Sequence, residues 1–210
     1  CIEYFGPIIG VGYGMAEILP PLCFLRPVMY IKGDKIDYNR LRTVGKVVKS
    51  VRIKVVDEMY KPLPIGKIGR MVFKSPTISG GYFNNQQLTE KHYRNGWFYS
   101  NDFGFIDKDG YVYFMGRKED IVKEEDGVCV FNREIEDILH QHPKVLKVCV
   151  FNADDGRIIA CVSPRLNLTV TSEELIKFCS ERLKDYQLPT SIIVFPDLPV
   201  AANGKLDRKE

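Results

Sequence analysis

Hydrophobic and polar positions follow two different rhythms along this chain, with the change near residue 116. Before it, apolar and polar residues mostly alternate, as in the segment VRIKV at positions 51–55. Alternation of this kind is typical of half-buried strands. After it, an apolar spacing of three and four residues at Ile135, Ile138 and Leu139 predicts an amphipathic helix, and β-like runs follow. The pattern therefore predicts a β-rich first part and a second part that mixes helices and strands.

The first part contains strand, turn and hairpin signals in close succession. Strands are expected at 51–55, 70–74, 104–107 and 111–115, and a short helix at 86–93. The triplet Lys108-Asp109-Gly110 between two of these strands is a hairpin signal. A Gly-rich segment at 10–14 predicts a tight turn after a strand; the alternative is that glycines at alternate positions let the backbone approach another group closely. The expected architecture is a small twisted sheet or an open barrel.

The second part begins where an apolar strand is followed by a run of charged residues. The apolar strand 111–115 is expected to turn at Gly116 and to give way to a run of charged residues at 117–126. We interpret this run as a joint between two folded bodies. Beyond it we expect a helix at 133–141, strands at 145–151, 157–163 and 191–195, and an exposed turn at 199–205. A further helix should start at a capping box formed by Thr171 and Glu174.

Composition narrows the functional classes. The 210 residues are 45% hydrophobic with a net charge of +3, and basic residues are interleaved with acidic ones, so a nucleic-acid partner is not expected. Apolar runs are broken by proline or charge, and the first residues lack the features of a signal peptide, which favours an intracellular protein without a transmembrane segment. Six cysteines form no C-x-x-C pair, so buried thiols are favoured over disulfides, and no Cys/His metal cluster is expected.

Four short motifs stand out, each of them weak alone. They are GYGMAE at 12–17, YSND at 99–102, GRKE at 116–119 and NGKL at 203–206. In this order and at these intervals they resemble the second half of the adenylate-forming superfamily of acyl-CoA synthetases, 4-coumarate-CoA ligases and firefly luciferases. The resemblance implies a mixed α+β fold of the α/β class. Residues 1–116 would be the β-rich end of a large AMP-binding domain, and 117–210 a small mobile C-terminal lid domain.

The resemblance implies a two-step reaction with ATP, Mg²⁺ and CoA. A carboxylic acid and ATP give an acyl-adenylate and pyrophosphate, and the CoA thiol then displaces AMP. Because two anions must approach each other, positive charge is needed near the α-phosphate. Lys205 matches the family lysine that supplies this charge, whereas the plain alternative is a solvated surface lysine.

The same resemblance assigns nucleotide contacts. Asp102 and Arg117 match the residues that contact the ribose, Tyr13 and Gly14 match the segment beside the adenine, and Glu17 matches the carboxylate that helps to hold Mg²⁺. Each side chain has a structural alternative. Asp102 could simply be an aspartate at the start of a hairpin, and Arg117 could form a salt bridge at the rim. Tyr13 could be a core residue, and Glu17 could be exposed or cap a helix.

Domain motion is also implied. Glu119 falls on the family's hinge, about which the lid swings between an adenylation pose and a thioester pose; in the second, the face with Lys123 and Gly127 approaches CoA.

The sequence departs from the family at several positions. These are Ala16 for Thr or Ser, Asn101 for Gly, Glu119 for Asp or Lys, a longer loop at 123–127, and Phe131-Asn132 for Ala/Ser-Pro.

The upstream phosphate loop of the family and most of its acyl pocket have no counterpart in this sequence. We therefore expect a part of a longer chain, inactive in adenylation by itself, in a cytoplasmic or peroxisomal protein. The leading interpretation is an acyl- or aryl-CoA ligase acting on a carboxylic acid that is a small molecule and that the sequence does not identify. The alternatives are an amino-acid-activating adenylation domain, a luciferase-like relative, and a non-catalytic remnant that binds nucleotide or a partner.

Overall fold

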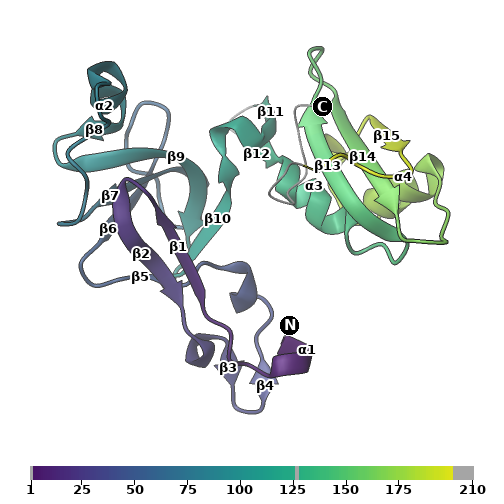
Figure 1. Ribbon diagram of the computed structural model, residues 1–210, viewed down its shortest axis with the longest axis horizontal. Helices are drawn as coiled ribbons and strands as arrows, with labels where there is room; N and C mark the ends of the chain where they lie inside the picture. Colours follow the sequence, from purple (N-terminus) through teal and green to yellow (C-terminus); the bar gives the residue numbers. More distant parts are fainter. Residues whose placement is uncertain (1, 126–127, 201–210) are drawn as a thin grey trace. The chain divides into compact units, whose positions relative to one another are not determined.

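The chain divides into two compact units, Cys1–Met115 and Gly116–Glu210 (Figure 1). The computed structural model describes residues 2–125 and 128–200. No helix among these residues is long and apolar enough to cross a membrane. Each unit has its own apolar core, as expected for independently packed bodies.

The first unit is built from a β-hairpin packed beside a larger sheet. The larger sheet has the order β10-β9-β7-β6, with β8 paired to β9, and the smaller one has the order β1-β2-β5. Side chains of Ile18, Leu22, Phe73 and Phe98 fill the core of this unit. The helices and strands are α1 (Ile2–Phe5), β1 (Val11–Met15), β2 (Ile18–Leu25), η1 (Pro27–Met29), β3 (Ile31–Lys32), β4 (Lys35–Ile36), η2 (Arg40–Arg42), β5 (Lys46–Val47), β6 (Arg52–Val56), β7 (Gly69–Lys74), α2 (Gln86–His92), β8 (Tyr93–Arg94), β9 (Trp97–Ile106) and β10 (Val112–Arg117).

The predicted strands and short helix of the first part are confirmed, but the predicted turn at 10–14 is wrong. Residues Val11–Met15 form β1, antiparallel to β2, because the hairpin reverses only after Met15, which pairs with Ile18. Glycine at position 14 is needed for this pairing. A Cβ atom there would lie 2.4 Å from Cβ of Pro20, so only glycine allows the two strands to approach so closely.

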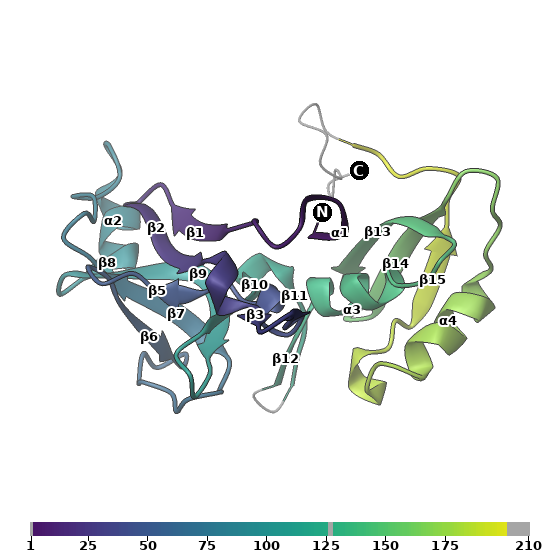
Figure 2. The ribbon, with the colours of Figure 1, turned by 90° about the horizontal axis from the view of Figure 1, so that it is seen from below.

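The second unit is a three-stranded sheet with two helices, preceded by a short hairpin. The sheet has the order β13-β14-β15, with β13 antiparallel and β15 parallel to β14. Helices α3 and α4 cover one face of it (Figure 2), where Ile135, Leu139 and Leu175 pack on Val148 and Val162. The elements are η3 (Lys118–Asp120), β11 (Ile121–Glu125), β12 (Val128–Phe131), α3 (Asn132–Leu139), β13 (Val145–Asn152), β14 (Ile158–Pro164), α4 (Ser172–Ser180), η4 (Asp185–Gln187) and β15 (Ser191–Val194).

Two expectations for this region are corrected. The expected turn at Gly116 is wrong, because β10 continues through Gly116 to Arg117, and part of the charged run after it forms β11, which pairs with β12. The start of α4 has half of the predicted capping box. The Thr171 side chain accepts the N–H of Glu174 at 3.2 Å, whereas the Glu174 carboxylate bonds to Lys144 Nζ at 2.8 Å.

Candidate functional site

A bulge in β9 determines the position of Asp102. Arg70 pairs with Phe103 and Val72 pairs with Tyr99, so β9 has extra residues relative to β7 over this stretch. The Ser100 hydroxyl stabilises the bulge by donating to the Met71 carbonyl at 2.7 Å and accepting the Asp102 N–H at 3.1 Å. Bulges of this kind redirect side chains next to functional sites. Asp102 is consequently almost buried, with 9% of its surface exposed.

The Tyr13 hydroxyl donates a hydrogen bond to Oδ2 of Asp102. Tyr13 projects from β1, and its ring contacts Phe73 and Phe114 at centroid distances of 5.9 and 5.8 Å. The ring of Tyr13 therefore packs in the core, as expected for a core tyrosine, while its hydroxyl reaches the Asp102 carboxylate. Two motifs that are 89 residues apart in sequence meet at this hydrogen bond.

Glu17 lies just beyond β1 and is tied to the segment before α2. Its Oε1 accepts the Tyr82 hydroxyl at 2.7 Å, and its backbone carbonyl accepts the N–H of Ser79 at 2.8 Å. Burial, together with the neighbouring Glu17 carboxylate, raises the pKa of Tyr82. Among the described residues, Oε2 of Glu17 has no hydrogen-bond donor, so it can serve as a single hard-oxygen ligand. No group of three or more His, Cys, Asp or Glu side chains within the described ranges could hold a metal on its own.

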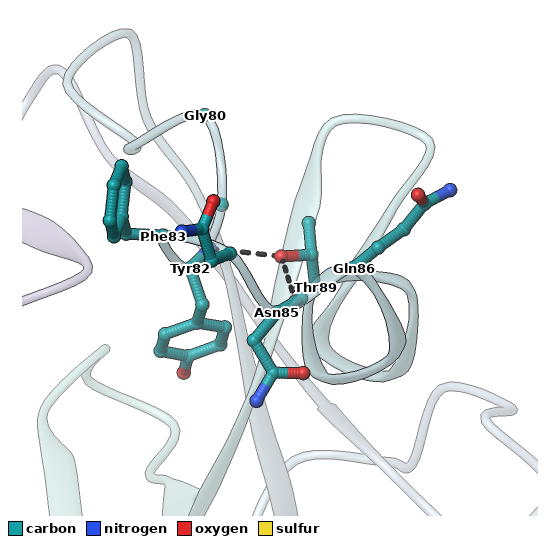
Figure 3. Close-up of a pocket in the computed structure, with 8 residues that line it drawn as sticks. Gly80, Tyr82, Phe83, Asn85, Gln86 and Thr89 are labelled. Carbon is teal, nitrogen blue, oxygen red and sulfur yellow. Dashed lines mark hydrogen bonds between the residues drawn. The ribbon is translucent and has the colours of Figure 1, made fainter.

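Tyr82 is also one of the residues that line an open hollow (Figure 3). It has a volume of about 880 Å³ and is lined by Gly80–Gln86 and Thr89. Thr89 organises its wall, since its hydroxyl accepts the Tyr82 N–H and donates to the Asn85 carbonyl, both at 2.9 Å (Figure 3). Phe83 is 94% exposed at its edge. The contact between Tyr82 and Glu17 has no signal in the sequence.

Two departures from the family pattern have different surroundings. Asn101 projects to the opposite face of β9 from Asp102, where its Oδ1 accepts a hydrogen bond from Arg70 at 3.3 Å. Ala16 is exposed at the reversal between β1 and β2. The Asn101 side chain therefore does not reach the Tyr13–Asp102 contact.

The remaining predicted residues belong to the second unit. Arg117 and Glu119 are both exposed, with Nη1 of the first 3.9 Å from Oε1 of the second. The Arg117 backbone N–H donates to Oδ2 of Asp120 at 2.8 Å. Lys123 lies in β11, opposite Val130. Gly127 and Lys205 lie outside the described residues.

Asp120 and its neighbours are structural residues that sequence reasoning missed. Asp120 bonds through one oxygen to the Arg117 N–H and through the other to Asn132 Nδ2 at 3.4 Å. Phe131 is fully buried, and a Cβ atom added at Gly116 would lie 2.8 Å from its ring. The departure Phe131-Asn132 is thus accommodated by packing against Gly116 and Asp120.

Two family models match the chain. The model described as AMP-binding enzyme matches residues 1–83, and the model described as AMP-binding enzyme C-terminal domain matches residues 134–205. Together the two matches extend over more than half of the chain.

Curated relatives are CoA ligases. The chain is 31% identical to the medium/long-chain-fatty-acid–CoA ligase FadD8 of Mycobacterium tuberculosis, covering 99% of this chain and 37% of that protein. It is 30% identical to the 2-succinylbenzoate–CoA ligase of Bacillus mycoides, covering all of this chain and 42% of that protein. The chain thus spans about two fifths of the length of these relatives.

The solved structures that resemble this chain include CoA synthetases as well. The o-succinylbenzoate CoA synthetase of Bacillus subtilis, in complex with the acyl-adenylate intermediate OSB-AMP, superposes with a TM-score of 0.85 at 27% identity, covering 100% of this chain and 42% of that one. The same enzyme in complex with ATP and a magnesium ion has a TM-score of 0.80 at 28% identity, covering 96% of this chain and 40% of that one. By sequence and by structure, the chain belongs to the AMP-binding, adenylate-forming enzymes.

Proposed function

We propose that the full-length protein containing this chain is an ATP-dependent acyl- or aryl-CoA ligase. It would join a carboxylic acid to AMP with release of pyrophosphate, and CoA would then displace AMP to give a thioester. The relatives, which are named as CoA ligases, support this reaction class. The observation that carries the proposal for this chain is the hydrogen bond between Tyr13 and Asp102, which joins two distant motifs at a nearly buried carboxylate.

In this proposal Asp102 binds the ribose of the nucleotide. A carboxylate has two oxygens, which suit the two hydroxyls of a vicinal diol, and hydrogen bonds to a charged acceptor are stronger than neutral ones. The Tyr13 hydroxyl orients the carboxylate, and the Tyr13 and Gly14 segment of β1 lies along the adenine. Arg117 is proposed as a second ribose contact from the other unit.

Glu17 is proposed to contribute one oxygen to Mg²⁺ on the ATP phosphates. Its oxygen Oε2, which accepts no hydrogen bond from the described residues, suits this ion, which commonly takes one or two protein carboxylates and completes its shell with phosphates and water. When bound, Mg²⁺ would offset the negative charge of the phosphates. The task of this chain's own residues is to hold the Glu17 carboxylate in place, through the Tyr82 hydroxyl.

The second unit is proposed to act as the mobile domain. Lys205 would bring positive charge to the carboxylate and α-phosphate during adenylation. Rotation at Glu119 would then replace Lys205 by the face that carries Lys123 and Gly127, next to CoA. Such a rotation exchanges catalytic groups without unfolding either body.

Carboxylate-dependent exchange between ATP and pyrophosphate tests this function in the full-length protein. We expect exchange with the wild-type protein and a loss of at least about 100-fold in Lys205→Ala, because the charge that stabilises the transition state is removed. Lys108→Ala, in an exposed turn, is the control and should leave exchange unchanged. Absence of exchange with any carboxylic acid, in a protein that still binds AMP, would favour the non-catalytic remnant instead.

A further inference from the structure

Two cysteines of the second unit lie directly opposite each other on neighbouring strands. Cys149 of β13 is paired with Cys161 of the antiparallel β14. Directly opposed residues of an antiparallel pair project to the same face of the sheet. Of the five cysteines whose structure is described, no other two are cross-strand partners, since Cys129 pairs with Glu124 and Cys23 with Tyr13 and Val47.

The two thiols lie on the face of the sheet opposite to the one that α3 and α4 cover. Val148, Val150, Ala160 and Val162, which alternate with the two cysteines, are packed into the core under α3 and α4. The thiols therefore project away from the helices. Cys149 is buried, with 8% of its surface exposed, whereas Cys161 is half-buried.

The hydrogen-bond register gives the spacing of the pair. The Ala153 N–H donates to the Arg157 carbonyl at 2.9 Å, at the end of the ladder. Hydrogen-bonded and non-hydrogen-bonded pairs alternate along an antiparallel ladder, and Cys149 and Cys161 are each four residues from this pair, so they also form a hydrogen-bonded pair. The intervening Val150 N–H points away from β14, since it donates to the Glu136 carboxylate at 2.9 Å. Cα atoms of hydrogen-bonded pairs are about 5.5 Å apart, within the range that disulfides span.

We propose that Cys149 and Cys161 form a redox-sensitive dithiol site that small-molecule disulfides convert to an intramolecular disulfide. The thiolate of Cys161, the more exposed of the two, attacks one sulfur of oxidised glutathione and displaces one glutathione thiolate. The Cys149 thiolate then attacks Sγ of Cys161 in the mixed disulfide and displaces the second. The two protein thiols are thereby oxidised, and one oxidised glutathione is reduced to two molecules of reduced glutathione.

The geometry also predicts that the bond is easily reversed. Cβ atoms of opposed residues are about 4.5–5.5 Å apart, whereas a relaxed disulfide needs about 3.5–4.5 Å, so closing the bond pulls the strands together. Strained disulfides are reduced more readily than relaxed ones. Burial raises the pKa of Cys161, so the first exchange step should accelerate as the pH rises toward alkaline values.

Peptide mapping provides the test, because trypsin separates the two cysteines after Arg157. The native chain is incubated with oxidised glutathione, alkylated and digested. We expect the peptides 148–157 and 158–165 to be linked, with a loss of two hydrogen atoms, and the link to disappear on treatment with excess reduced glutathione. Cys161→Ser and Cys161→Ala should each abolish the link, and the matched control Cys129→Ser should retain it.

Three results would overturn the proposal. The first is that both cysteines are alkylated separately after oxidation of a folded wild-type chain. The second is that glutathione remains attached to Cys161 without transfer to Cys149. The third is that the link forms only after denaturation, which would show that the native sheet holds the thiols too far apart.

Discussion

At the scale of single residues, the Tyr13–Asp102 hydrogen bond is the feature on which the proposed nucleotide site depends. Asp102 is almost buried, and the carboxylate needs donors to offset its desolvation. The sequence motifs predicted both residues as site residues. The bulge and the hydroxyl contact that bring them together depend on strand register, which local patterns do not encode.

Tyr13→Phe tests this contact. It keeps the ring packed between Phe73 and Phe114 and removes only the hydroxyl, so we expect stability to fall by about 1–3 kcal/mol. Urea unfolding followed by the fluorescence of Trp97, the single tryptophan, measures this in the first unit. Tyr38→Phe, at an exposed position, is the control.

A double-mutant cycle separates the hydrogen bond from general packing. In an Asp102→Asn background the Tyr13→Phe change should cost less, because the charged acceptor is already gone. Equal costs in the two backgrounds would mean that the hydroxyl does not stabilise the carboxylate.

At the scale of elements, the sequence predicted regular strands and helices well and predicted reversals less well. Strand β6 follows directly from the alternation at 51–55, and helix α3 from the helical spacing of Ile135, Ile138 and Leu139. The glycines of 10–14 suggested a turn, whereas close approach of β1 to Pro20 is what requires Gly14. Strand β11 within the charged run was not predicted, because β-propensity in a short hairpin is weak and pairing with β12 decides the outcome.

The β9–β10 hairpin should be sensitive to acid through Asp107. Its carboxylate is partly desolvated, which raises the pKa, but hydrogen bonds from the Tyr111 N–H and from Arg40 outweigh this and hold the pKa below its usual range. A lowered folded-state pKa gives stability that is present above the unfolded-state pKa, near 3.9, and lost as the pH falls through the folded-state value.

Unfolding in urea at pH 7 and at successively lower pH values tests this. We expect Asp107→Asn to lose about 1–3 kcal/mol at pH 7 and to show a smaller further loss in acid than the wild-type protein. Asp34→Asn, in an exposed turn, should behave as wild type. Identical acid profiles for Asp107→Asn and wild type would exclude Asp107 as a source of the pH dependence.

At the scale of the whole molecule, the proposed reaction needs two units that move as bodies. Each unit has its own core, and η3, which contains Glu119, starts directly after β10. Sequence motifs assigned residues to both units, but a motif carries no information on how two bodies pack. The roles of Arg117, Glu119 and Lys205 therefore stay predictions.

Glu119→Pro tests the hinge in the full-length protein. Proline fixes φ and restricts the residue before it, so rotation at this point should be blocked while each unit stays folded. We expect ATP–pyrophosphate exchange to be retained and thioester formation with CoA to be lost. Parallel loss of both activities would contradict a rotating domain.

Binding of AMP to the full-length protein, measured by calorimetry, tests the central claim most directly. If Asp102 holds the ribose, Asp102→Asn should weaken binding by about tenfold or more, since a hydrogen bond to a charged group contributes about 1.5–3 kcal/mol. Asn101→Ala, whose side chain contacts Arg70 on the opposite face of β9, should bind as wild type. Unchanged affinity in Asp102→Asn, or an equal loss in both variants, would contradict a nucleotide site at Tyr13 and Asp102.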